Sequence, residues 1–319
     1  MKILIAPLNW GLGHATRCIP LINKYLSEGH DVVLGGDGDS LLLLRRIFPN
    51  LRVVDFPSLE LRYDENPNQY VFYWRAIPLL LRFTIADHYY LRQLLAREKF
   101  DLVVSDNRFG LFSRDVHSVY ITHQLYPILP KHLRLFQSLV RALHARIYTR
   151  YDEVWVPDYR DVSCCLSGDL SHGGDFDTKV KYIGPLSRFR GKNISLDKMS
   201  YPVVVILSGL EPQRTLFEKE ILQRFENQSD KVLLVRGKVG EPNTTIQKKN
   251  ITIVSSITDK DLISAVQGAR KIIARSGYST IMDFDALGVL SKAELHPTPG
   301  QSEQEYLSSL HVVESLINN

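Results

Sequence analysis

A histidine stands directly after the first apolar run of the chain, where it could transfer a proton. The chain begins MKILIAPLNWGLGHATRC, and Gly11 and Gly13 lie in the turn that leads from residues 3–6 to His14. An imidazole has a pKa near neutrality and could accept the proton of an attacking hydroxyl. A histidine at a helix start can equally be a polar cap, and glycines there can simply allow tight packing. Both interpretations stay open on these residues alone.

A carboxylate improves such a base because it orients the other ring nitrogen and stabilises the imidazolium. Asp106 is the candidate, since it follows the apolar run 101–104 in DLVVSDNRFG. Catalytic groups gather at the carboxyl ends of strands in open α/β sheets. The alternative is that Asp106 caps a following helix.

The elements that must position these residues alternate between strands and helices. Helical patterns cover 19–28, 40–46 and 86–98, which predicts a doubly wound α/β sheet in the first half. The apolar runs between turn residues read as buried parallel strands. These runs are 3–6, 31–34, 51–54, 101–104, 119–122, 153–156 and 180–183.

A second series of the same kind follows residues 187–200, SRFRGKNISLDKMS, which lose apolar periodicity and read as a linker. We therefore expect an N-terminal Rossmann-like domain over 1–186, a linker over 187–200 and a C-terminal Rossmann-like domain over 201–319, facing across a cleft. The second series has strands at 203–207, 231–236, 251–255 and 271–274 and helices at 215–226, 259–267 and 279–287.

Composition limits the compartment and the kind of partner. Cys18, Cys164 and Cys165 are too few for a disulfide framework, and buried thiols in a reducing cytoplasm are the simpler interpretation. The N-terminal apolar stretch breaks at Pro7 and is shorter than a membrane span, so we expect neither a signal peptide nor a transmembrane helix. The net charge of +4 is modest, which argues against a general nucleic-acid-binding protein.

The most specific pattern lies near the C-terminus. ARSGYSTIMD over 274–283 follows an apolar run, and PTPGQSEQEY follows over 297–306. This arrangement of R-S-G-x-x-T, an acidic residue and P-x-x-x-Q-x-x-Q resembles the donor-binding half of GT-B glycosyltransferases. It is most similar to the family of the peptidoglycan N-acetylglucosaminyltransferase MurG and related UDP-glycosyltransferases.

The resemblance implies a donor site. Ser276, Gly277 and the following N–H groups would bind a diphosphate at a helix N-terminus, and Asp283 would bind ribose hydroxyls. Gln304 would bind sugar hydroxyls, with Gln301 beside it, because amides offer donors and an acceptor without a charge to desolvate.

Other segments carry further implied roles. Arg188 in IGPLSR would contact the diphosphate, and Arg275 is a second candidate for stabilising leaving-group charge. The backbone of Ile257, in SSITDKDL, would pair with a pyrimidine base. Ser208 and Gly209 match the start of a glycine-rich turn near the phosphates, and the 11–14 turn is similar to the family's GxGGH loop.

The chain departs from the family pattern in three places. After Ser208 the turn reads GLEPQR, so Pro212 lacks an N–H that could hold phosphate, and Arg214 is the candidate to compensate. Glu294 and His296 interrupt an expected apolar strand, which a short edge strand would tolerate. GT-B enzymes commonly continue past the position of Tyr306 into helices that return to the first domain, so incomplete domain closure is a further expectation.

One segment has two interpretations. No Asp or Glu occurs from 116 to 151, a stretch that includes HLRLFQSLVRALHARIYTR, and an aromatic, basic segment YVFYWRAIPLLLRF covers 70–83. The first interpretation is an apolar core stripe at helical spacing with basic residues facing water. The second is a basic amphipathic helix at 131–150 on an anionic membrane surface, suited to a lipid-linked acceptor. The stripe consists of Leu133, Leu135, Leu139, Val140, Leu143 and Ile147.

The resulting hypothesis is an inverting, metal-independent glycosyltransferase without a cofactor, in which His14, oriented by Asp106, deprotonates a glycan or lipid-linked acceptor. The resemblance implies a UDP-sugar donor. Asp37 and Asp39 have the spacing of a metal-binding pair but read as a turn after the second strand.

Three rival functions are weighed against this hypothesis. They are a nucleotide-sugar 2-epimerase of the same architecture, a non-catalytic nucleotide-sugar-binding subunit, and a nicotinamide oxidoreductase. The last is disfavoured because Gly11 and Gly13 lack the third glycine of the dinucleotide motif and Gly35-Gly36 stands where an acidic residue is expected.

Overall fold

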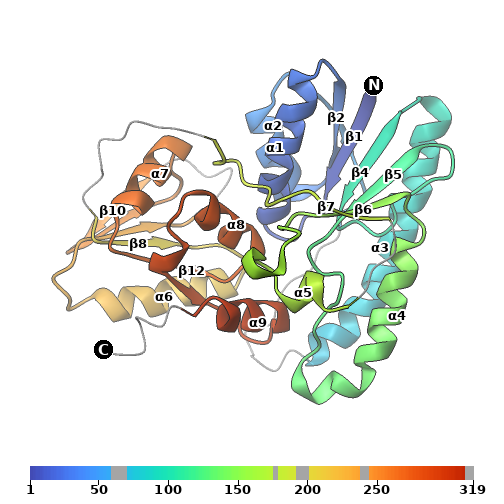
Figure 1. Ribbon diagram of the computed structural model, residues 1–319. Coiled ribbons are helices and arrows are strands. Elements are labelled where there is room, and N and C mark those ends of the chain that lie inside the picture. The colour runs from blue at the N-terminus through green and yellow to red at the C-terminus, as the bar shows by residue number, and fades with distance from the viewer. Residues whose placement is uncertain (59–69, 175–178, 192–200, 238–243, 313–319) are drawn as a thin grey trace. The chain divides into compact units, whose positions relative to one another are not determined.

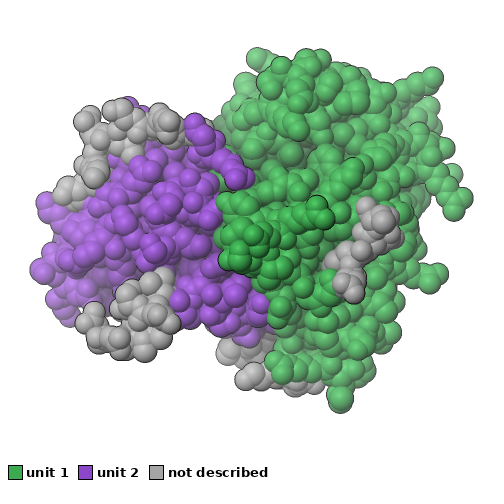
Figure 2. Space-filling view, viewed as in Figure 1, with its two compact units in different colours: residues 1–61, 68–188 green, residues 62–67, 189–319 purple. Residues whose placement is uncertain are grey.

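The computed structural model describes residues 1–58, 70–174, 179–191, 201–237 and 244–312. The chain forms two compact units (Figures 1 and 2), unit 1 with the described residues up to 188 and unit 2 with those from 189 onward. Most of the predicted linker, 192–200, lies outside the described residues. Within this part of the chain no helix is long and apolar enough to cross a membrane.

The described part of unit 1 is built on a seven-stranded sheet in the order β3-β2-β1-β4-β5-β6-β7, and every neighbouring pair is parallel. Each predicted apolar run overlaps one strand. The apolar runs are continuous because a parallel sheet is covered on both faces. The strands are β1 (Lys2–Pro7), β2 (Asp31–Gly36), β3 (Arg52–Asp55), β4 (Leu102–Asp106), β5 (His117–Ile121), β6 (Glu153–Val156) and β7 (Val180–Tyr182).

Helices cover this sheet, and the three that were predicted are all longer than expected. The first begins at Gly13 rather than Ile19, which places His14 in its first turn. Apolar periodicity could not show this start, because the residues before Cys18 are mostly polar or small. The helices are α1 (Gly13–Ser27), α2 (Gly38–Ile47), α3 (Tyr70–Arg97), α4 (Gln137–Tyr148) and the short α5 (Asp169–His172), with 3-10 turns η1 (Lys131–Phe136) and η2 (Val162–Cys164).

Unit 2 has a six-stranded sheet over its described residues, in the order β10-β11-β9-β8-β12-β13. Its pairs are parallel except β10 with β11, and β10 was not predicted because its residues are exposed and lack an apolar run. The elements are β8 (Val203–Ile206), α6 (Gln213–Phe225), β9 (Val232–Val235), β10 (Thr245–Lys248), β11 (Ile251–Val254), α7 (Asp259–Gly268), β12 (Lys271–Arg275), α8 (Tyr278–Ala286), η3 (Leu290–Lys292), β13 (Ala293–His296) and α9 (Ser302–Leu310).

Alternate residues of the unit 2 strands enter two separate cores. Val203 and Val205 pack with Phe217 and Ile221 of α6, whereas Val204 packs with Phe284 of α8 in the cluster that α7 also enters. Successive strand residues point to opposite faces, so helices must cover both. The predicted doubly wound α/β fold class is therefore confirmed.

The polar residues in β13 have a structural explanation. β13 is an edge strand, and Glu294 forms ion pairs with Arg224 of α6 at 2.5 Å, with Lys271 of β12, and with His296 at 2.6 Å. Burial alone would raise the pKa of Glu294, but its hydrogen bonds to these three groups outweigh burial and hold that pKa below its usual range. Glu294 thus attaches the edge strand to its neighbours in place of apolar packing.

A buried group of charges, which we call the Arg108 cluster, joins three segments at the carboxyl edge of the unit 1 sheet. Arg108 is fully buried, and its guanidinium donates to Asp37 Oδ1 at 2.6 Å and to both oxygens of Asp87 at 2.7 and 3.0 Å. Asp37 follows β2, Asp87 lies on α3, and Arg108 follows β4. The prediction of a turn at 37–39 is wrong, because Asp37 is the N-cap of α2 and Gly38 and Asp39 lie in the first turn of that helix. Asp37 is also a buried partner of Arg108.

Candidate functional site

The turn between β1 and α1 holds His14 at the carboxyl edge of the unit 1 sheet. Gly11 has φ +78°, a left-handed conformation in which glycine is unstrained. Ser40 fixes the turn, because its hydroxyl donates to the carbonyl of Gly11 at 3.2 Å and its N–H donates to Asn9 Oδ1 at 3.2 Å. Gly13 begins α1, so His14 lies within the first turn of a helix held against the sheet.

Asp106 is the last residue of β4, and its carboxylate meets the His14 ring. β1 and β4 are adjacent with Pro7 paired to Asp106, which brings two segments far apart in sequence to the same sheet edge. His14 Nδ1 lies 2.8 Å from Asp106 Oδ1, and Asp106 is completely buried. The structure therefore places the two predicted residues in contact, while their catalytic role stays a prediction.

Arg17, which the sequence analysis missed, shares this carboxylate. Its Nε donates to Asp106 Oδ2 at 2.6 Å, and its Nη2 donates to Asp106 Oδ1. Arg17 is only 2% exposed. Residues three apart lie on the same face of a helix, and the start of α1 at Gly13 therefore lets His14 and Arg17 reach one partner.

Two more side chains surround the carboxylate. Cys18 Sγ donates to Asp106 Oδ2 at 3.5 Å, and Arg17 Nη1 lies 3.3 Å from His123 Nδ1, which follows β5. Because a guanidinium can only donate, His123 Nδ1 must accept and carry no proton in this contact. The result is a buried group from α1, β4 and the residues after β5, which we call the His14 cluster: His14, Arg17, Cys18, Asp106 and His123.

The electrostatics of this cluster favour an ionised Asp106 and a neutral His14. Burial alone would raise the pKa of Asp106, but the charges of Arg17 and His14 and their hydrogen bonds outweigh it and hold that pKa well below its usual range. Burial lowers the pKa of His14, the charge of Arg17 lowers it further, and Asp106 opposes both. At neutral pH the ring can therefore accept a proton.

The tautomer of His14 follows from its partners. Nδ1 faces the Asp106 carboxylate at 2.8 Å and also lies 2.9 Å from Arg17 Nη2. A carboxylate only accepts, so the contact with Asp106 puts the proton on Nδ1, and on this assignment Arg17 Nη2 lies beside Nδ1 and donates to Asp106 Oδ1 rather than to the ring. This leaves the lone pair on Nε2, which has no hydrogen-bond partner in the described part of the chain. The His14 side chain is 15% exposed, so the cluster reaches solvent through the atom that would act as base.

In unit 2, α8 begins directly after β12 at the carboxyl edge of its sheet. Gly277 is the N-cap of α8, and among the described residues its N–H has no hydrogen-bond partner. A Cβ at Gly277 would meet only Thr280 Oγ1 at 3.9 Å, so the space beside its Cα is open. A helix N-terminus with an open N–H suits an anion.

The side chain of Ser276 has its partner within unit 2. It is fully buried, its hydroxyl donates to the carbonyl of Gln304 at 2.8 Å, and its N–H donates to the carbonyl of His296 at 3.1 Å. In this conformation the Ser276 hydroxyl donates within unit 2, and a role of Ser276 at a diphosphate stays a prediction. Ser276 fixes the end of β12 to β13 and α9.

The two predicted glutamines lie at the start of α9. Gln301 is its N-cap, and Gln304 lies in the first turn with its Oε1 accepting the Thr298 N–H at 2.8 Å. The side-chain oxygen of Gln304 thus holds the loop before α9, and its NH₂ group has no partner in the part of the chain that the structure describes. Asp283 is half-buried on α8, one and a half turns after Gly277.

Arg275 lies behind this edge and is 5% exposed. Its Nη1 donates to the carbonyl of Pro297 at 2.7 Å and its Nη2 to that of Gln213 at 3.3 Å, and its guanidinium stacks 4.0 Å from the Phe217 ring centroid. Burial lowers the pKa of Arg275 to about 10, so it stays charged at neutral pH. Arg275 thus joins the start of α6 to the loop before α9. Its guanidinium is buried behind this edge, so its charge would act on a ligand without direct contact.

The turn after β8 contains Ser208 and Gly209, which are half-buried and exposed. Arg214, the candidate to compensate for Pro212, donates to Glu211 Oε1 at 2.8 and 3.0 Å, and Glu211 Oε2 accepts the Thr215 N–H at 3.2 Å. A carboxylate of the chain itself therefore caps the N-terminus of α6.

Ile257 and Arg188 complete the predicted donor residues. Ile257 lies between β11 and α7, and its backbone N–H and carbonyl have no hydrogen-bond partner among the described residues, so both are available to a base edge. Arg188 is half-buried at the end of unit 1.

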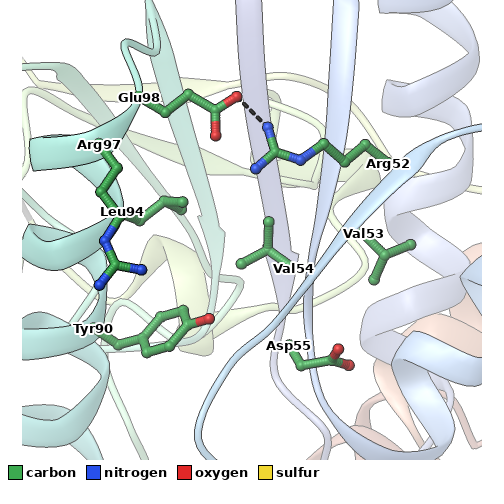
Figure 3. Close-up of a pocket in the computed structure, with 8 residues that line it drawn as sticks. All are labelled: Arg52, Val53, Val54, Asp55, Tyr90, Leu94, Arg97 and Glu98. Atoms are coloured by element: carbon green, nitrogen blue, oxygen red, sulfur yellow. Dashed lines mark hydrogen bonds and ion pairs between the residues drawn. The ribbon is translucent and has the colours of Figure 1, made fainter.

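An open groove of about 660 Å³ in unit 1 lies away from both predicted sites (Figure 3). It is lined by β3 and the C-terminal part of α3, including Val54, Tyr90 and Arg97. Its Arg52 is already paired with Glu98, as the dashed line in the figure marks. The two carboxylates that line the groove, Asp55 and Glu98, are paired with Arg45 and Arg52, and none of the predicted site residues lines it.

Only part of the apolar stripe at 133–147 faces the core, where Ile147 packs against a buried cluster. Leu135 is 94% exposed, and Leu139 and Leu143 are each 57% exposed. The interpretation as a core stripe is therefore wrong for Leu135, Leu139 and Leu143. These leucines face outward because the face of α4 that carries Tyr148 packs on the core. Three arginines of this segment are also exposed: Arg134, Arg146 and Arg150. The structure does not describe the side chains of Lys131 and of residues 70–77.

Comparison with known proteins gives a consistent result. No protein-family model matches the chain. It is 25% identical to an uncharacterized glycosyltransferase of Methanosarcina acetivorans, covering 98% of this chain and 83% of that protein, and 23% identical to one of Methanosarcina mazei, covering 96% and 82%.

Solved structures of glycosyltransferases share the fold. The kitacinnamycin glycotransferase aligns with TM-score 0.61 at 15% identity, covering 97% of this chain and 83% of that one. The calicheamicin glycosyltransferase CalG4 aligns with TM-score 0.60 at 16% identity, covering 98% and 83%. The spinosyn rhamnosyltransferase SpnG, solved with thymidine diphosphate, aligns with TM-score 0.62 at 11% identity, covering 97% and 84%.

Proposed function

We propose that this chain, which has the GT-B fold of glycosyltransferases, is an inverting glycosyltransferase that moves a sugar from a nucleoside diphosphate onto an acceptor hydroxyl or amine. The observation that carries the proposal is the contact of His14 Nδ1 with the buried Asp106 carboxylate, which leaves Nε2 unprotonated at the surface of the site. An imidazole oriented in this way is suited to take a proton from a nucleophile.

The reaction is a single displacement. The acceptor oxygen or nitrogen forms a bond to the anomeric carbon while the bond from that carbon to the diphosphate oxygen breaks. The acceptor proton passes to His14 Nε2, and the leaving diphosphate keeps the electron pair. Attack opposite the leaving group inverts the anomeric configuration.

The leaving charge must be stabilised, and unit 2 provides groups for this. The open N–H of Gly277 at the start of α8 can donate to a phosphate oxygen, and the α8 dipole favours negative charge there. Arg188, the last residue of unit 1, is the proposed direct cation, and Arg275 of unit 2 would act from behind. In this proposal the amides and arginines carry the charge without a metal ion or cofactor.

We assign the donor to the pyrimidine nucleoside diphosphate sugars, with UDP-sugars first. The backbone groups of Ile257 offer a donor and an acceptor to a base edge, Asp283 would bind ribose hydroxyls, and the NH₂ of Gln304 remains for a sugar hydroxyl. SpnG, with which the chain shares its fold, was solved with thymidine diphosphate, which makes thymidine donors the second choice.

Nucleotide binding is expected to raise the melting temperature of the chain. A ligand that binds only the folded state at a hundredfold excess over its Kd stabilises by about 2.7 kcal/mol. UDP, UDP-N-acetylglucosamine, UDP-glucose, thymidine diphosphate, GDP-mannose and NADH would be compared by differential scanning fluorimetry. The shift with pyrimidine diphosphates should disappear in Asp283→Ala and persist in Asp285→Ala, a neighbouring acid of the same helix.

A shift with NADH alone, or equal shifts in the parent and Asp283→Ala, would contradict the donor assignment. Incubating the binding nucleotide sugar without acceptor, followed by NMR of the sugar, separates the rival activity. Conversion to the C2 epimer would identify an epimerase, whereas a transferase leaves the configuration of the donor sugar unchanged.

The exposed apolar stripe supports a membrane-facing acceptor, and we assign it to an anionic bilayer surface at the cytoplasmic face. Leu135, Leu139 and Leu143 recur every four residues along η1 and α4 and are exposed, and exposed arginines accompany them without a nearby acid. Apolar insertion and attraction to anionic lipids act together in such segments. A lipid-linked acceptor would then meet the enzyme at its own surface.

Vesicle sedimentation tests this contact. The chain should bind vesicles that contain phosphatidylglycerol more strongly than pure phosphatidylcholine, and Leu139→Glu with Leu143→Glu should remove most of the binding because two carboxylates would enter the interface. Leu42→Glu on α2, where Leu42 is 46% exposed, is the matched control. Equal binding of all three proteins would rule out this surface.

A further inference from the structure

Arg17 uses all three of its guanidinium nitrogens within the His14 cluster. Nε and Nη2 donate to the two oxygens of Asp106, and Nη1 donates to His123 Nδ1. This bidentate hold fixes the plane and the rotation of the carboxylate, and Asp106 Oδ1 consequently faces His14 Nδ1. Two of the three elements around the base, α1 and β4, are thus joined through one cation.

The position is costly, so stability alone does not account for it. Arg17 is 2% exposed and Asp106 is fully buried, and a buried ion pair often contributes little net stability compared with apolar packing. Arg108, only two residues after Asp106, is buried in the same way, but it faces Asp37 and Asp87. Of the two, only Arg17 touches the His14 imidazole, with Nη2 at 2.9 Å from Nδ1.

The charges explain what this contact does. Without Arg17, the imidazole would face a lone buried carboxylate that stabilises the imidazolium strongly. With Arg17, the formal charges of Asp106 and Arg17 cancel, so the ring lies beside a neutral pair. When His14 takes a proton from an acceptor, the buried cluster gains a net positive charge. Burial disfavours this charge, so His14 holds the proton only briefly before releasing it.

We propose that Arg17 is a positioning residue for the transfer reaction, which locks Asp106 against His14 and keeps the imidazole unprotonated and ready to accept the acceptor proton. This role rests on the proposed function of His14. Among the described residues, the charged and titratable groups that act on His14 are Arg17 from α1, Asp106 from β4 and His123 after β5, and Cys18 from α1 contacts Asp106.

The direct test is the titration of His14 itself, which does not depend on a known substrate. The protein would be labelled with 13C-histidine, and the ring Cε1–H signals followed by NMR between about pH 4 and about pH 9. His14→Gln identifies the signal, because one of the ten histidine signals disappears. In Arg17→Gln the His14 midpoint should move to higher pH, because a positive charge beside the ring is lost.

Arg17→Lys separates charge from geometry. An ammonium keeps the positive charge but cannot hold both carboxylate oxygens, so the His14 midpoint should stay near that of the parent while kcat falls about a hundredfold with KM little changed. Cys18→Ala is the matched control, because it removes a neutral contact to the same carboxylate and should leave the His14 midpoint in place.

An unchanged or lower His14 midpoint in folded Arg17→Gln would overturn the proposal. If Arg17→Gln does not fold, Arg17→Lys decides, and a kcat within twofold of the parent would overturn it. Failure to find any glycosyl transfer would refute the proposed function alone, since the NMR titration of the parent and Arg17→Gln would still show whether Arg17 controls the proton on His14.

Discussion

Replacing His14 with alanine is expected to lower kcat for glycosyl transfer by about two to four orders of magnitude, the usual contribution of a general base. In the parent, Nε2 of His14 is unprotonated and reaches solvent, while Nδ1 is held by Asp106 at 2.8 Å. Alanine removes the only atom of the His14 cluster that combines a free lone pair with exposure. The acceptor must then lose its proton to water.

In the proposed function the donor binds to unit 2, so nucleotide binding should survive this change. The melting-temperature shift with the preferred nucleotide should be equal in His14→Ala and the parent, which shows that the loss is in the chemical step. Asp106→Asn should also lower kcat strongly, since an amide can donate to Nδ1 and select the tautomer with the proton on Nε2. His117→Ala, at the amino end of β5, is the control histidine.

Radiolabelled sugar transfer to a panel of lipid-linked and soluble acceptors, followed over the initial rate, provides the measurement. A kcat for His14→Ala within tenfold of the parent would show that another group accepts the proton. In that case the ordered Asp106 would have to be explained as a structural partner of Arg17 alone.

The elements of the fold could be predicted because the sheets are parallel and buried on both faces. Their strands are continuous apolar runs, and the observed strands overlap all the predicted runs. Elements without such a signal were missed or shortened. β10 is exposed throughout, and the first turns of α1 are polar, so neither shows an apolar pattern.

The site could be predicted only as far as sheet topology determines it. Adjacent parallel strands bring their carboxyl ends together, which was sufficient to place His14 near Asp106. Arg17 could not be identified in the same way, because arginines on helices usually face water and nothing in the sequence shows that this one is 2% exposed. The buried hydroxyl of Ser276 shows the same limit, since the motif predicts its position but not the direction of its side chain.

The exposed leucines of α4 show a different limit. Their spacing predicts an apolar face in either interpretation, because a helix that enters a core and one that lies on a membrane have the same periodicity. The two interpretations differ in which face of the helix packs on the core. In this structure the face that carries Tyr148 does so, because Tyr148 packs with Tyr120 and Tyr151. Such contacts between distant residues are not visible in a local pattern.

The Arg108 cluster leads to the largest expected effect on stability. Arg108→Met is expected to lower the free energy of unfolding of unit 1 by about 3 to 5 kcal/mol, as for other buried ion pairs that lose one partner. Methionine roughly fills the space, but Asp37 and Asp87, which are 6% and 0% exposed, keep buried carboxylates without a cation. Arg45→Met, which breaks an exposed pair with Asp55, should cost less than about 1 kcal/mol.

This loss should depend on pH in a defined direction. Burial raises the pKa of Asp87 to about 6, and Arg108 opposes that rise. A carboxyl whose pKa is raised in the folded state contributes most to stability below its unfolded value of 3.8, and this contribution is lost as pH rises through about 6. Without Arg108 the pKa of Asp87 rises further, so the deficit of Arg108→Met should be small near pH 5 and large near pH 8.

Urea unfolding followed by tryptophan fluorescence measures this in the full chain, because Trp10, Trp74 and Trp155 all precede residue 189, where unit 2 begins. Adding Asp37→Asn and Asp87→Asn to Arg108→Met should restore much of the stability at pH 8, since neutral amides remove the unpaired charge. A deficit equal at both pH values would show that lost packing between Phe56 and Phe83, rather than the two carboxylates, dominates the effect of Arg108.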